Sequence, residues 1–243
     1  MTGIDGIGIH DLRVKVFADG ADLTEIASAA QDPLIQGFTT NPTLMRQAGV
    51  DDYERFARQV LEIIGDKPIS FEVFTDELEE THRQAQRIAE WGDNVFVKIP
   101  VTNSIGEPSY DLIGKLVADG VSVNVTAVFT VEQIEAVATR LAGGPTSFLS
   151  VFAGRIADAG TDPSPYVRHA VDAVADEQQV QVIWASTREI LNVVQADQCG
   201  CQIITLTGDL IRKLPGLGKD LATFSLETVQ MFRRDAMAAG YEL

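Results

Sequence analysis

The sequence predicts an α/β fold, a single (β/α)8 TIM barrel over residues 1–243 with an additional C-terminal helix. Three observations predict it. A unit consisting of a short β-rich run, a loop and an amphipathic segment recurs eight times along the chain. The length of 243 residues and the 45% of apolar residues suit one barrel with a large core. No linker or change of composition divides the chain.

The β-rich runs end in loops that contain Gly, Pro, Asn or Thr. In VKVFAD, ISFEVF, VSVNVTA and FLSVFAG, successive side chains alternate between two faces. VFVKIP is an apolar run with one lysine, typical of a strand buried on both faces of a parallel sheet. The predicted strands occupy residues 14–20, 35–42, 69–75, 95–100, 121–129, 147–154, 181–186 and 202–207.

The segments between the strands have apolar residues at three- and four-residue spacing, the pattern of an amphipathic helix. Residues 51–64 and 76–91 are clear examples. A last helix is predicted over residues 225–240, because this segment opens with Ser, has Glu in its first turn and stops at Gly. Residues 1–13 lack the basic and apolar regions of a secretory signal, and they are predicted to be a short leader instead.

A doubly wound open sheet is the alternative fold, but it usually has fewer β-then-α units. The glycines of GIDGIGIH precede the first strand and have the wrong spacing for a dinucleotide fingerprint. PGLGKD lacks both the glycine spacing and the following Ser or Thr of a phosphate-binding loop. These absences favour the barrel.

The composition excludes several classes of function. The formal net charge of −16 opposes a nucleic acid or an anionic membrane surface as the main partner, but it permits a small anionic ligand beside local arginines. No apolar run is long enough to span a bilayer. A disulfide between Cys199 and Cys201 would be strained, so a cytoplasmic, reducing location is expected. The three scattered histidines lack metal-ligand spacing, and neither a metal nor a cofactor is predicted.

Polar side chains collect on one face of the predicted strands. The alternation directs Val123, Val125 and Ala127 toward the helices and their polar neighbours the other way. In a barrel this other face is the interior, and enzymes place their chemistry at its carboxyl end. The polar residues predicted to meet there are Asp19, Glu72, Lys98, Asn124, Thr126 and Ser150. Single polar residues also occur in barrel interiors for structural reasons, but six at one mouth favour a functional site.

Lys98 is the candidate nucleophile. It lies late in its apolar run, where the amine loses hydration, and lost hydration favours the uncharged form that attacks a carbonyl. Its rival, Lys15, lies early in its strand, toward the barrel floor. Imine chemistry and carbon–carbon cleavage each need a proton-transfer group, and Asp19 and Glu72 lie on two different strands.

An anion site is predicted at the ends of the sixth and seventh strands. Arg155 follows the sixth strand, and Ser186 and Arg188 end the seventh. Ser186 and Thr187 would add backbone donors at a helix start. Two arginines on adjacent strand ends favour a bound anion, although Arg188 alone could instead pair with Glu189 or with a neighbouring helix.

Five motifs in chain order resemble the transaldolase family, which includes the shorter fructose-6-phosphate aldolases. They are FTTNPTL, VFVKIPVT, VNVTAVF, SVFAGRI and WASTREI. The similarity runs from about Val14 to the last strand, and the chain length resembles the short subgroup. The resemblance implies a class I aldolase-type barrel in which Lys98 forms a Schiff base without a metal, because the protonated imine accepts the electrons.

The resemblance also implies roles for residues at the mouth. Asp19 matches the carboxylate that takes the proton from the C4 hydroxyl as the C3–C4 bond breaks. Glu72 and Thr126 match the pair that positions a water during formation and hydrolysis of the imine. The residues that match those binding the dihydroxyacetone fragment are Asn41, Asn124 and Ser150. Those that match the phosphate grip are Arg155, Ser186 and Arg188.

Two positions distinguish the branches of the family. Aldolase members typically have Tyr at the position of Phe152 and Gln at that of Glu72. Phe152 offers no proton to a bound enamine, so the intermediate should persist until a second aldehyde arrives. We therefore expect a transaldolase that moves a dihydroxyacetone unit from fructose 6-phosphate or sedoheptulose 7-phosphate to an aldose phosphate.

Several alternatives stay open. A class I aldolase of the same family would release free dihydroxyacetone, and the same chemistry could act on another anionic ketose such as a sulfonated sugar. A non-catalytic sugar-phosphate-binding barrel or a scaffold protein is disfavoured because Lys98, Asp19 and Glu72 occur together. The expected partners are small sugar phosphates and copies of the same chain in a homo-oligomer. The C-terminal helix could cover the mouth or dock on a neighbouring subunit.

Overall fold

The computed structural model describes residues 8–241 as a closed barrel of eight parallel strands. Each strand pairs with its neighbours in chain order, and β8 returns to pair with β1. This architecture confirms the predicted (β/α)8 TIM barrel with an additional C-terminal helix. The strands are β1 (Lys15–Asp19), β2 (Ile35–Thr39), β3 (Ile69–Glu72), β4 (Val95–Pro100), β5 (Val123–Val128), β6 (Ser147–Val151), β7 (Val180–Trp184) and β8 (Ile203–Thr207).

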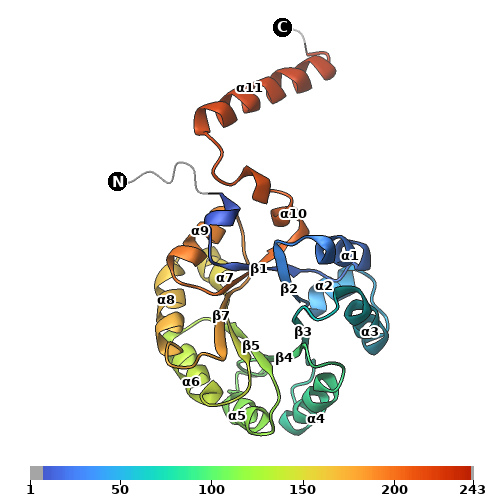
Figure 1. The fold of residues 1–243 in the computed structure, drawn as a ribbon, viewed down its shortest axis with the longest axis vertical. Helices are drawn as coiled ribbons and strands as arrows, with labels where there is room; N and C mark the ends of the chain where they lie inside the picture. The colour runs from blue at the N-terminus through green and yellow to red at the C-terminus, as the bar shows by residue number, and fades with distance from the viewer. Residues whose placement is uncertain (1–7, 242–243) are drawn as a thin grey trace.

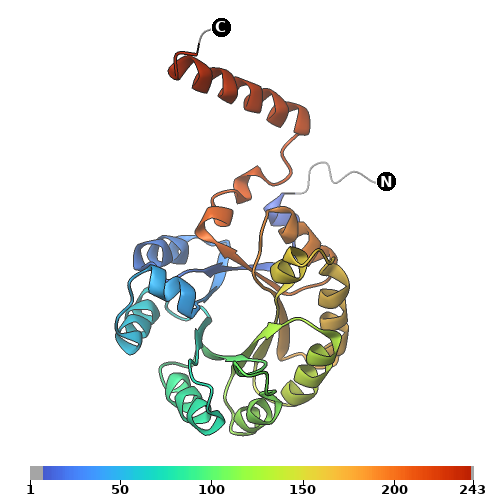
Figure 2. The same ribbon diagram turned by 180° about the vertical axis from the view of Figure 1, so that it is seen from behind.

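The helices surround the strands, as Figure 1 and Figure 2 show from opposite sides. Asp22, Asp52 and Thr130 each begin a helix by accepting hydrogen bonds from backbone N–H groups of its first turn. The α-helices are α1 (Leu23–Gln31), α2 (Pro42–Gln47), α3 (Tyr53–Ile64), α4 (Leu78–Ala89), α5 (Tyr110–Ala118), α6 (Val131–Leu141), α7 (Ala153–Asp158), α8 (Ser164–Ala173), α9 (Leu191–Gln198), α10 (Gly208–Ile211) and α11 (Leu221–Ala238). Short 3-10 helices occupy Ile9–Asp11 and Leu214–Gly216.

The apolar core has an outer and an inner layer. Outward-facing strand residues such as Val123 pack with the helices. Inside the barrel, the Phe96 and Phe148 rings stack with centroids 4.0 Å apart, and Phe17 meets Phe148 edge-on. Gly37 leaves room for this layer, because a Cβ there would lie 2.5 Å from the Phe17 ring. Each of the three rings precedes a polar mouth residue by two positions, so the inner layer forms an apolar base beneath the mouth.

The C-terminal helix differs from its prediction in where it starts. It begins at Leu221 rather than at Ser225, because Asp220 caps it by accepting a hydrogen bond from the Thr223 N–H at 2.8 Å. The strands occur at the predicted places, with their ends displaced by a few residues. Residues 1–7 of the predicted leader lie outside the described part of the chain.

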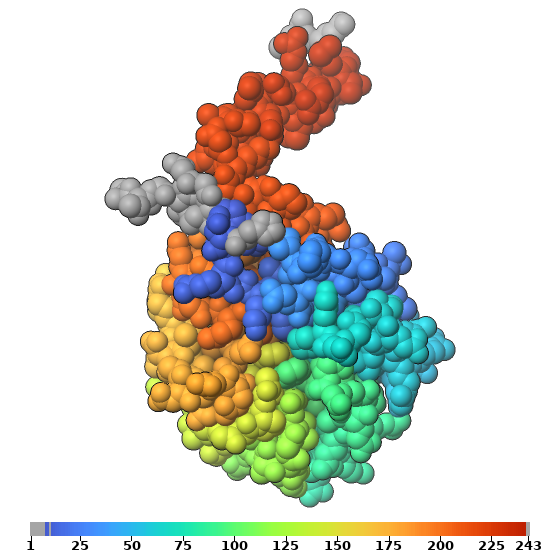
Figure 3. Space-filling model, viewed as in Figure 1, coloured from blue at the N-terminus to red at the C-terminus, as the bar shows by residue number. Residues whose placement is uncertain are grey.

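Helix α11 extends away from the barrel as a separate arm, which is clear in Figure 1 and in the space-filling view of Figure 3. None of its residues is buried. Its exposed apolar side chains include Leu221, Phe224, Val229 and Phe232. No residue of α11 lines the cavity at the barrel mouth, so the helix does not cover it.

The far end of the barrel contains the remaining residues singled out in the sequence. Lys15 is half-buried there, with its Nζ 3.4 Å from Gln181 Oε1. Cys199 and Cys201 are free and buried near the start of β8. Within residues 8–241, no helix combines the length and the apolar character required to cross a bilayer.

Candidate active site

A cavity of about 520 Å³ opens at the carboxyl ends of the strands. All parallel strands of a barrel end at this face, so residues distant in the sequence meet here. The cavity brings together all eleven predicted site residues: Asp19, Asn41, Glu72, Lys98, Asn124, Thr126, Ser150, Phe152, Arg155, Ser186 and Arg188. Their shared location follows from the structure, while their chemical roles stay predictions.

Lys98 is buried in the wall of this cavity. Its Nζ lies 3.0 Å from Glu72 Oε2 and donates a hydrogen bond to the Thr40 carbonyl at 3.1 Å. The ion pair follows from the register, since Glu72 on β3 lies opposite Lys98 on β4. The surroundings of the Lys98 amine are therefore more polar than the apolar run suggests. The Glu72 carboxylate replaces part of the lost hydration and is placed to accept a proton from the amine.

Asp19 is the second carboxyl of the site. It lies at the end of β1 and accepts a hydrogen bond from Thr39 Oγ1 at 2.8 Å. Burial raises the pKa of Asp19, while the charge of Lys98 and the Thr39 hydrogen bond oppose this rise. A carboxyl with a raised pKa gives and takes protons more readily near neutral pH. Sequence reasoning missed Thr39, although it lies within the motif FTTNPTL.

A chain of buried hydrogen bonds fixes the Asn124 amide. Ser150 Oγ donates to Asn124 Oδ1 at 2.7 Å, and Asn124 Nδ2 donates to Ser70 Oγ at 2.9 Å. The chain joins β6, β5 and β3 across the barrel interior. Ser70 was also missed, although the alternation that identified Glu72 places Ser70 on the same face.

The β5 strand bulges where Thr126 enters the cavity. The register with β6 shifts between Val125 and Val128, and Ala127 has a φ of 56°, which is uncommon for a residue with a Cβ. Ala127 consequently lines the cavity, so the simple alternation fails at this residue. The buried Thr126 Oγ1 has no hydrogen-bond partner in the described part of the chain, which leaves it available to a water or a substrate.

Asn41 and Phe152 occupy the N-cap positions immediately before two short helices. Asn41 caps α2, because its Oδ1 accepts a hydrogen bond from the Leu44 N–H at 3.0 Å. The Asn41 amide nitrogen does not take part in this bond and can donate elsewhere. Phe152 precedes α7, and its ring lies 5.7 Å from that of Phe129 beside the inner apolar layer.

The predicted anion-binding residues lie where α7 meets the loop after β7. Ser186 has a left-handed backbone with a φ of 63°. A Cβ on Gly154 of α7 would lie 1.6 Å from the Ser186 carbonyl oxygen, so only glycine permits this approach. Thr187, which follows Ser186, is buried with an unpartnered Oγ1 among the described residues and also lines the cavity.

Arg188 has a carboxylate partner. Its Nε lies 3.1 Å from Asp158 Oδ1, and its Nη2 lies 2.5 Å from Asp158 Oδ2. Pairing with a neighbouring helix was the alternative to a free anion site, and Asp158 is the last residue of α7. Sequence reasoning missed Asp158 and Gly154, because both act through contacts with the loop after β7, about thirty residues later in the chain.

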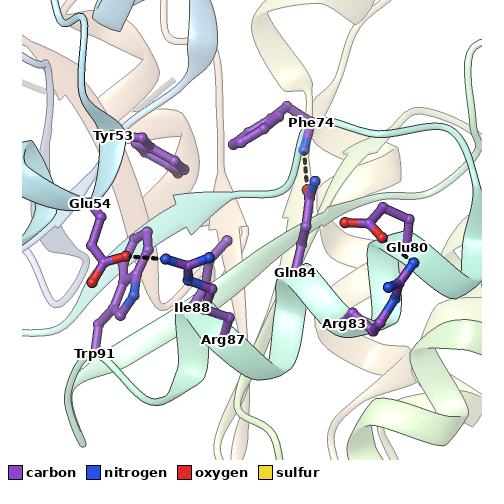
Figure 4. A pocket seen from close by; sticks show the side chains of 9 residues that line it. All are labelled: Tyr53, Glu54, Phe74, Glu80, Arg83, Gln84, Arg87, Ile88 and Trp91. Carbon is purple, nitrogen blue, oxygen red and sulfur yellow. Dashed lines mark hydrogen bonds and ion pairs between the residues drawn. The ribbon is translucent and has the colours of Figure 1, made fainter.

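A second hollow lies outside the mouth, between α3 and α4. Tyr53, Phe74 and Trp91 contribute its aromatic wall, as Figure 4 shows. Tyr53 Oη donates a hydrogen bond to the Glu72 carbonyl at 2.9 Å, so this aromatic group supports the end of β3 from behind. Within residues 8–241, no group of three or more His, Cys, Asp or Glu side chains is arranged to hold a metal ion.

Comparison with known families identifies the family of this chain. The model of the family "Transaldolase/Fructose-6-phosphate aldolase" matches residues 16–242. A "Probable transaldolase" from Dehalococcoides mccartyi is 35% identical over 194 residues, which cover 79% of this chain and 86% of that protein. A "Probable transaldolase" from Desulforudis audaxviator is 36% identical over 207 residues, which cover 84% of this chain and 90% of that protein.

Solved structures support the same architecture. The crystal structure of 2,3-dimethylmalate lyase, a PEP mutase/isocitrate lyase superfamily member, superposes with a TM-score of 0.56 at 14% sequence identity. The match covers 92% of this chain and 83% of that one, and at this low sequence identity it supports the fold alone. The family match extends over nearly the whole chain and includes every residue of the mouth cavity. The chain belongs to the transaldolase/fructose-6-phosphate aldolase family.

Proposed function

We propose that this protein is a transaldolase that transfers a dihydroxyacetone unit from a ketose phosphate to an aldose phosphate through an imine on Lys98. The observation that carries the proposal is the buried Lys98 amine, 3.0 Å from the Glu72 carboxylate in the mouth cavity of a barrel of this family. An amine, an adjacent proton acceptor and a second carboxyl on another strand are the groups this chemistry requires.

Imine formation uses Lys98 and Glu72. Lys98 gives up a proton, for which Glu72 is the adjacent acceptor, and the free amine attacks the C2 carbonyl of the ketose. The adduct then loses water to become an iminium ion. Thr126 can hold this water, because its buried hydroxyl has no partner among the described residues. The Asn124 amide, fixed by Ser150 and Ser70, would bind the hydroxyl groups of the dihydroxyacetone unit.

Transfer uses Asp19. Asp19 takes the proton of the C4 hydroxyl, the C3–C4 bond breaks, and its electron pair moves to the iminium nitrogen to leave an enamine. The first aldose phosphate departs, and the enamine carbon attacks the aldehyde of the second. Asp19 returns its proton to the new hydroxyl, and water then hydrolyses the imine. The raised pKa of Asp19 suits both proton transfers.

Borohydride trapping tests the imine. Incubation with fructose 6-phosphate and borohydride should add a reduced dihydroxyacetone group to Lys98, which peptide mass spectrometry can locate. Lys15 provides an internal control, because it is the other lysine of the barrel interior and lies at the opposite end. An adduct on Lys15 or any other lysine would refute the assigned nucleophile, and the absence of an adduct would refute fructose 6-phosphate as donor.

Phe152 favours transfer over simple cleavage. It has no hydroxyl to protonate the enamine, and its ring lies beside Phe129 and the apolar layer. Fructose 6-phosphate alone should therefore give less than about one-tenth of the turnover seen with an added four-carbon aldose phosphate. Product analysis by mass spectrometry checks this ratio. Equal release of dihydroxyacetone without an acceptor would instead favour the aldolase alternative.

We also propose that the chain forms a homo-oligomer in which α11 packs against another copy. Helix α11 has no buried residue and exposes apolar side chains along an 18-residue helix. Helices in proteins gain most of their stability by packing an apolar face, so α11 needs a partner surface. A helix that leaves its own barrel and binds a second one can do so reciprocally in a symmetric dimer. The two free cysteines fit the cytoplasmic setting proposed for this assembly.

Replacement of Phe232 by Asp should weaken the oligomer. Phe232 is 62% exposed in the single chain, so an aspartate there should not disturb the fold of the chain itself. The new charge matters only if another copy covers this surface. We expect at least a tenfold rise in the dissociation constant, since burying an unpaired charge costs more than about 1.4 kcal/mol. Light scattering over a dilution series measures it. Ile105→Asp is the matched control, because Ile105 is 76% exposed on a loop of the barrel; equal effects of both variants would contradict the role of α11.

A further inference from the structure

We propose that Asp158 sets the charge preference of the anion-binding end of the cavity, by holding Arg188 and cancelling part of the positive charge there. The inference rests on the proposed function, and it names a residue that decides between singly and doubly charged substrate groups. Asp158 acts through Arg188 and is therefore a positioning residue. It determines how strongly the site prefers a dianionic phosphate to a monoanionic group such as a sulfonate.

The contact between the two side chains is two-pronged. Arg188 uses Nε and Nη2 to contact both carboxylate oxygens of Asp158, at 3.1 Å and 2.5 Å. This side-on geometry leaves Nη1 and one proton of Nη2 free to donate to a ligand. A carboxylate that orients a guanidinium in this way reduces the side-chain freedom that Arg188 would lose on binding an anion.

The backbone on both sides of the pair is also fixed. The N–H groups of Arg188 and Glu189 both donate to Asn192 Oδ1, at 3.0 Å and 3.1 Å. On the opposite side, a Cβ on Gly154 would lie 3.3 Å from Arg188 Cγ, so the stem of Arg188 lies against α7. Asp158 belongs to the same short helix. The backbone and the stem of Arg188 are thus held in place, while the two charged ends stay about half exposed, Arg188 at 46% and Asp158 at 53%.

The surroundings indicate that a ligand binds beside this pair. Thr187 is buried, lines the same cavity and has an Oγ1 without a partner in the described part of the chain. Arg155 also lines the cavity and takes part in no ion pair of the described residues. Both arginines act electrostatically on Asp158 and help to lower its pKa, with the Arg188 hydrogen bond as the largest cause. Two arginines therefore line this end of the cavity, and the Asp158 carboxylate contacts one of them from outside the lining.

The charge balance has a consequence for selectivity. Two arginines alone would present two positive charges and strongly favour a dianion. The Asp158 carboxylate offsets one of them and repels a dianion about twice as strongly as a monoanion at the same place. Removing its charge therefore strengthens the binding of both kinds of ligand, but more for the dianion. Loss of Arg188 positioning acts in the opposite direction, because the arginine also attracts a dianion more strongly, so a rise in the ratio reports the removed carboxylate charge.

The test compares fructose 6-phosphate with 6-deoxy-6-sulfofructose, which differ in the charge of the terminal group. Calorimetry gives the two dissociation constants in a Lys98→Met background, where no turnover occurs, with and without Asp158→Asn. We expect the preference for the phosphate to rise about threefold to fivefold at low salt and to shrink at high salt. Asp158→Glu, which keeps the charge, should leave the ratio near its original value.

A matched control separates a local effect from a change in net charge. Asp111 forms an ion pair with Arg140 at 2.9 Å on the outer surface, between α5 and α6. Asp111→Asn removes the same charge and should not alter the ratio. An unchanged ratio in Asp158→Asn, an equal change in both variants, or no binding of either ligand would each overturn the proposal.

The two proposals fail in different ways. Failure of the imine to form on Lys98 would refute the proposed reaction, while the ratio of dissociation constants would still report on Asp158. Conversely, suppose that the imine is trapped on Lys98 but Asp158→Asn leaves the ratio of dissociation constants unchanged. This result would support the proposed reaction and refute only the role of Asp158.

Discussion

Lys98→Met should lower turnover at least about a thousandfold, because it removes the amine that forms the imine and keeps only the apolar stem. It should also leave Glu72 without its partner at 3.0 Å. Breaking a buried ion pair from one side costs about 3–5 kcal/mol, less whatever Glu72 regains by taking up a proton. We therefore expect a folded but less stable protein, measurable by urea denaturation beside a coupled transaldolase assay.

Two further variants separate the chemical loss from the structural one. Lys98→Met combined with Glu72→Gln removes both charges and should regain most of the stability without regaining turnover. Lys15→Met removes the other interior lysine, whose Nζ lies near Gln181 at the floor, and should keep most of the activity. Substantial turnover in Lys98→Met would exclude an imine on Lys98. Loss of turnover in Lys15→Met would indicate that the reactive amine is Lys15, at the opposite end of the barrel.

Gly154→Ala should have the second-largest effect. Its new Cβ would lie 1.6 Å from the Ser186 carbonyl oxygen. Neither atom can avoid the other by a side-chain rotation, because the positions of both are set by the backbone. The loop after β7 must therefore move away from α7, and with it Arg188. We expect a stability loss of about 2–3 kcal/mol from overpacking. We also expect KM for the phosphorylated donor to rise at least about tenfold, because small displacements of binding groups have large effects.

Gly216→Ala provides the matched control for this experiment. No atom lies within 4 Å of the position where its Cβ would be built, so stability and KM should both stay near those of the original protein. Denaturation curves and initial rates measured on both variants make the comparison. If Gly154→Ala behaved like Gly216→Ala, the close contact between α7 and the loop after β7 would not matter for the anion end of the cavity.

Much of the fold and of the site could be predicted from local patterns. Every strand has an apolar face or run, because a barrel strand must bury side chains against the surrounding helices. Lys98 interrupts such a run, which made it conspicuous. The period of two then placed Glu72 and Asn124 on the interior face. These inferences need only the neighbouring residues in the chain, and the cavity brings the three together.

The features that the sequence did not reveal depend on contacts between distant segments or on unusual backbone. Nothing local to Arg188 indicates that Asp158 would hold it, or that Gly154 would touch Ser186. The bulge at Ala127 breaks the strand period at the point where the cavity begins. Functional sites often contain such departures, because they orient a side chain in a way that a regular strand cannot.

The pairing of β1 with β8 determines when this barrel can first exist during its synthesis. The ribosome makes β1 early, yet its second neighbour, β8, ends only at Thr207. Until that residue has emerged, the nascent chain is an open sheet with two exposed edges, the condition that invites pairing with other chains. In the described part of the chain, α10, a 3-10 turn and α11 follow β8. Helix α11 is therefore made after β8, so its exposed apolar side chains appear only when the barrel can already close.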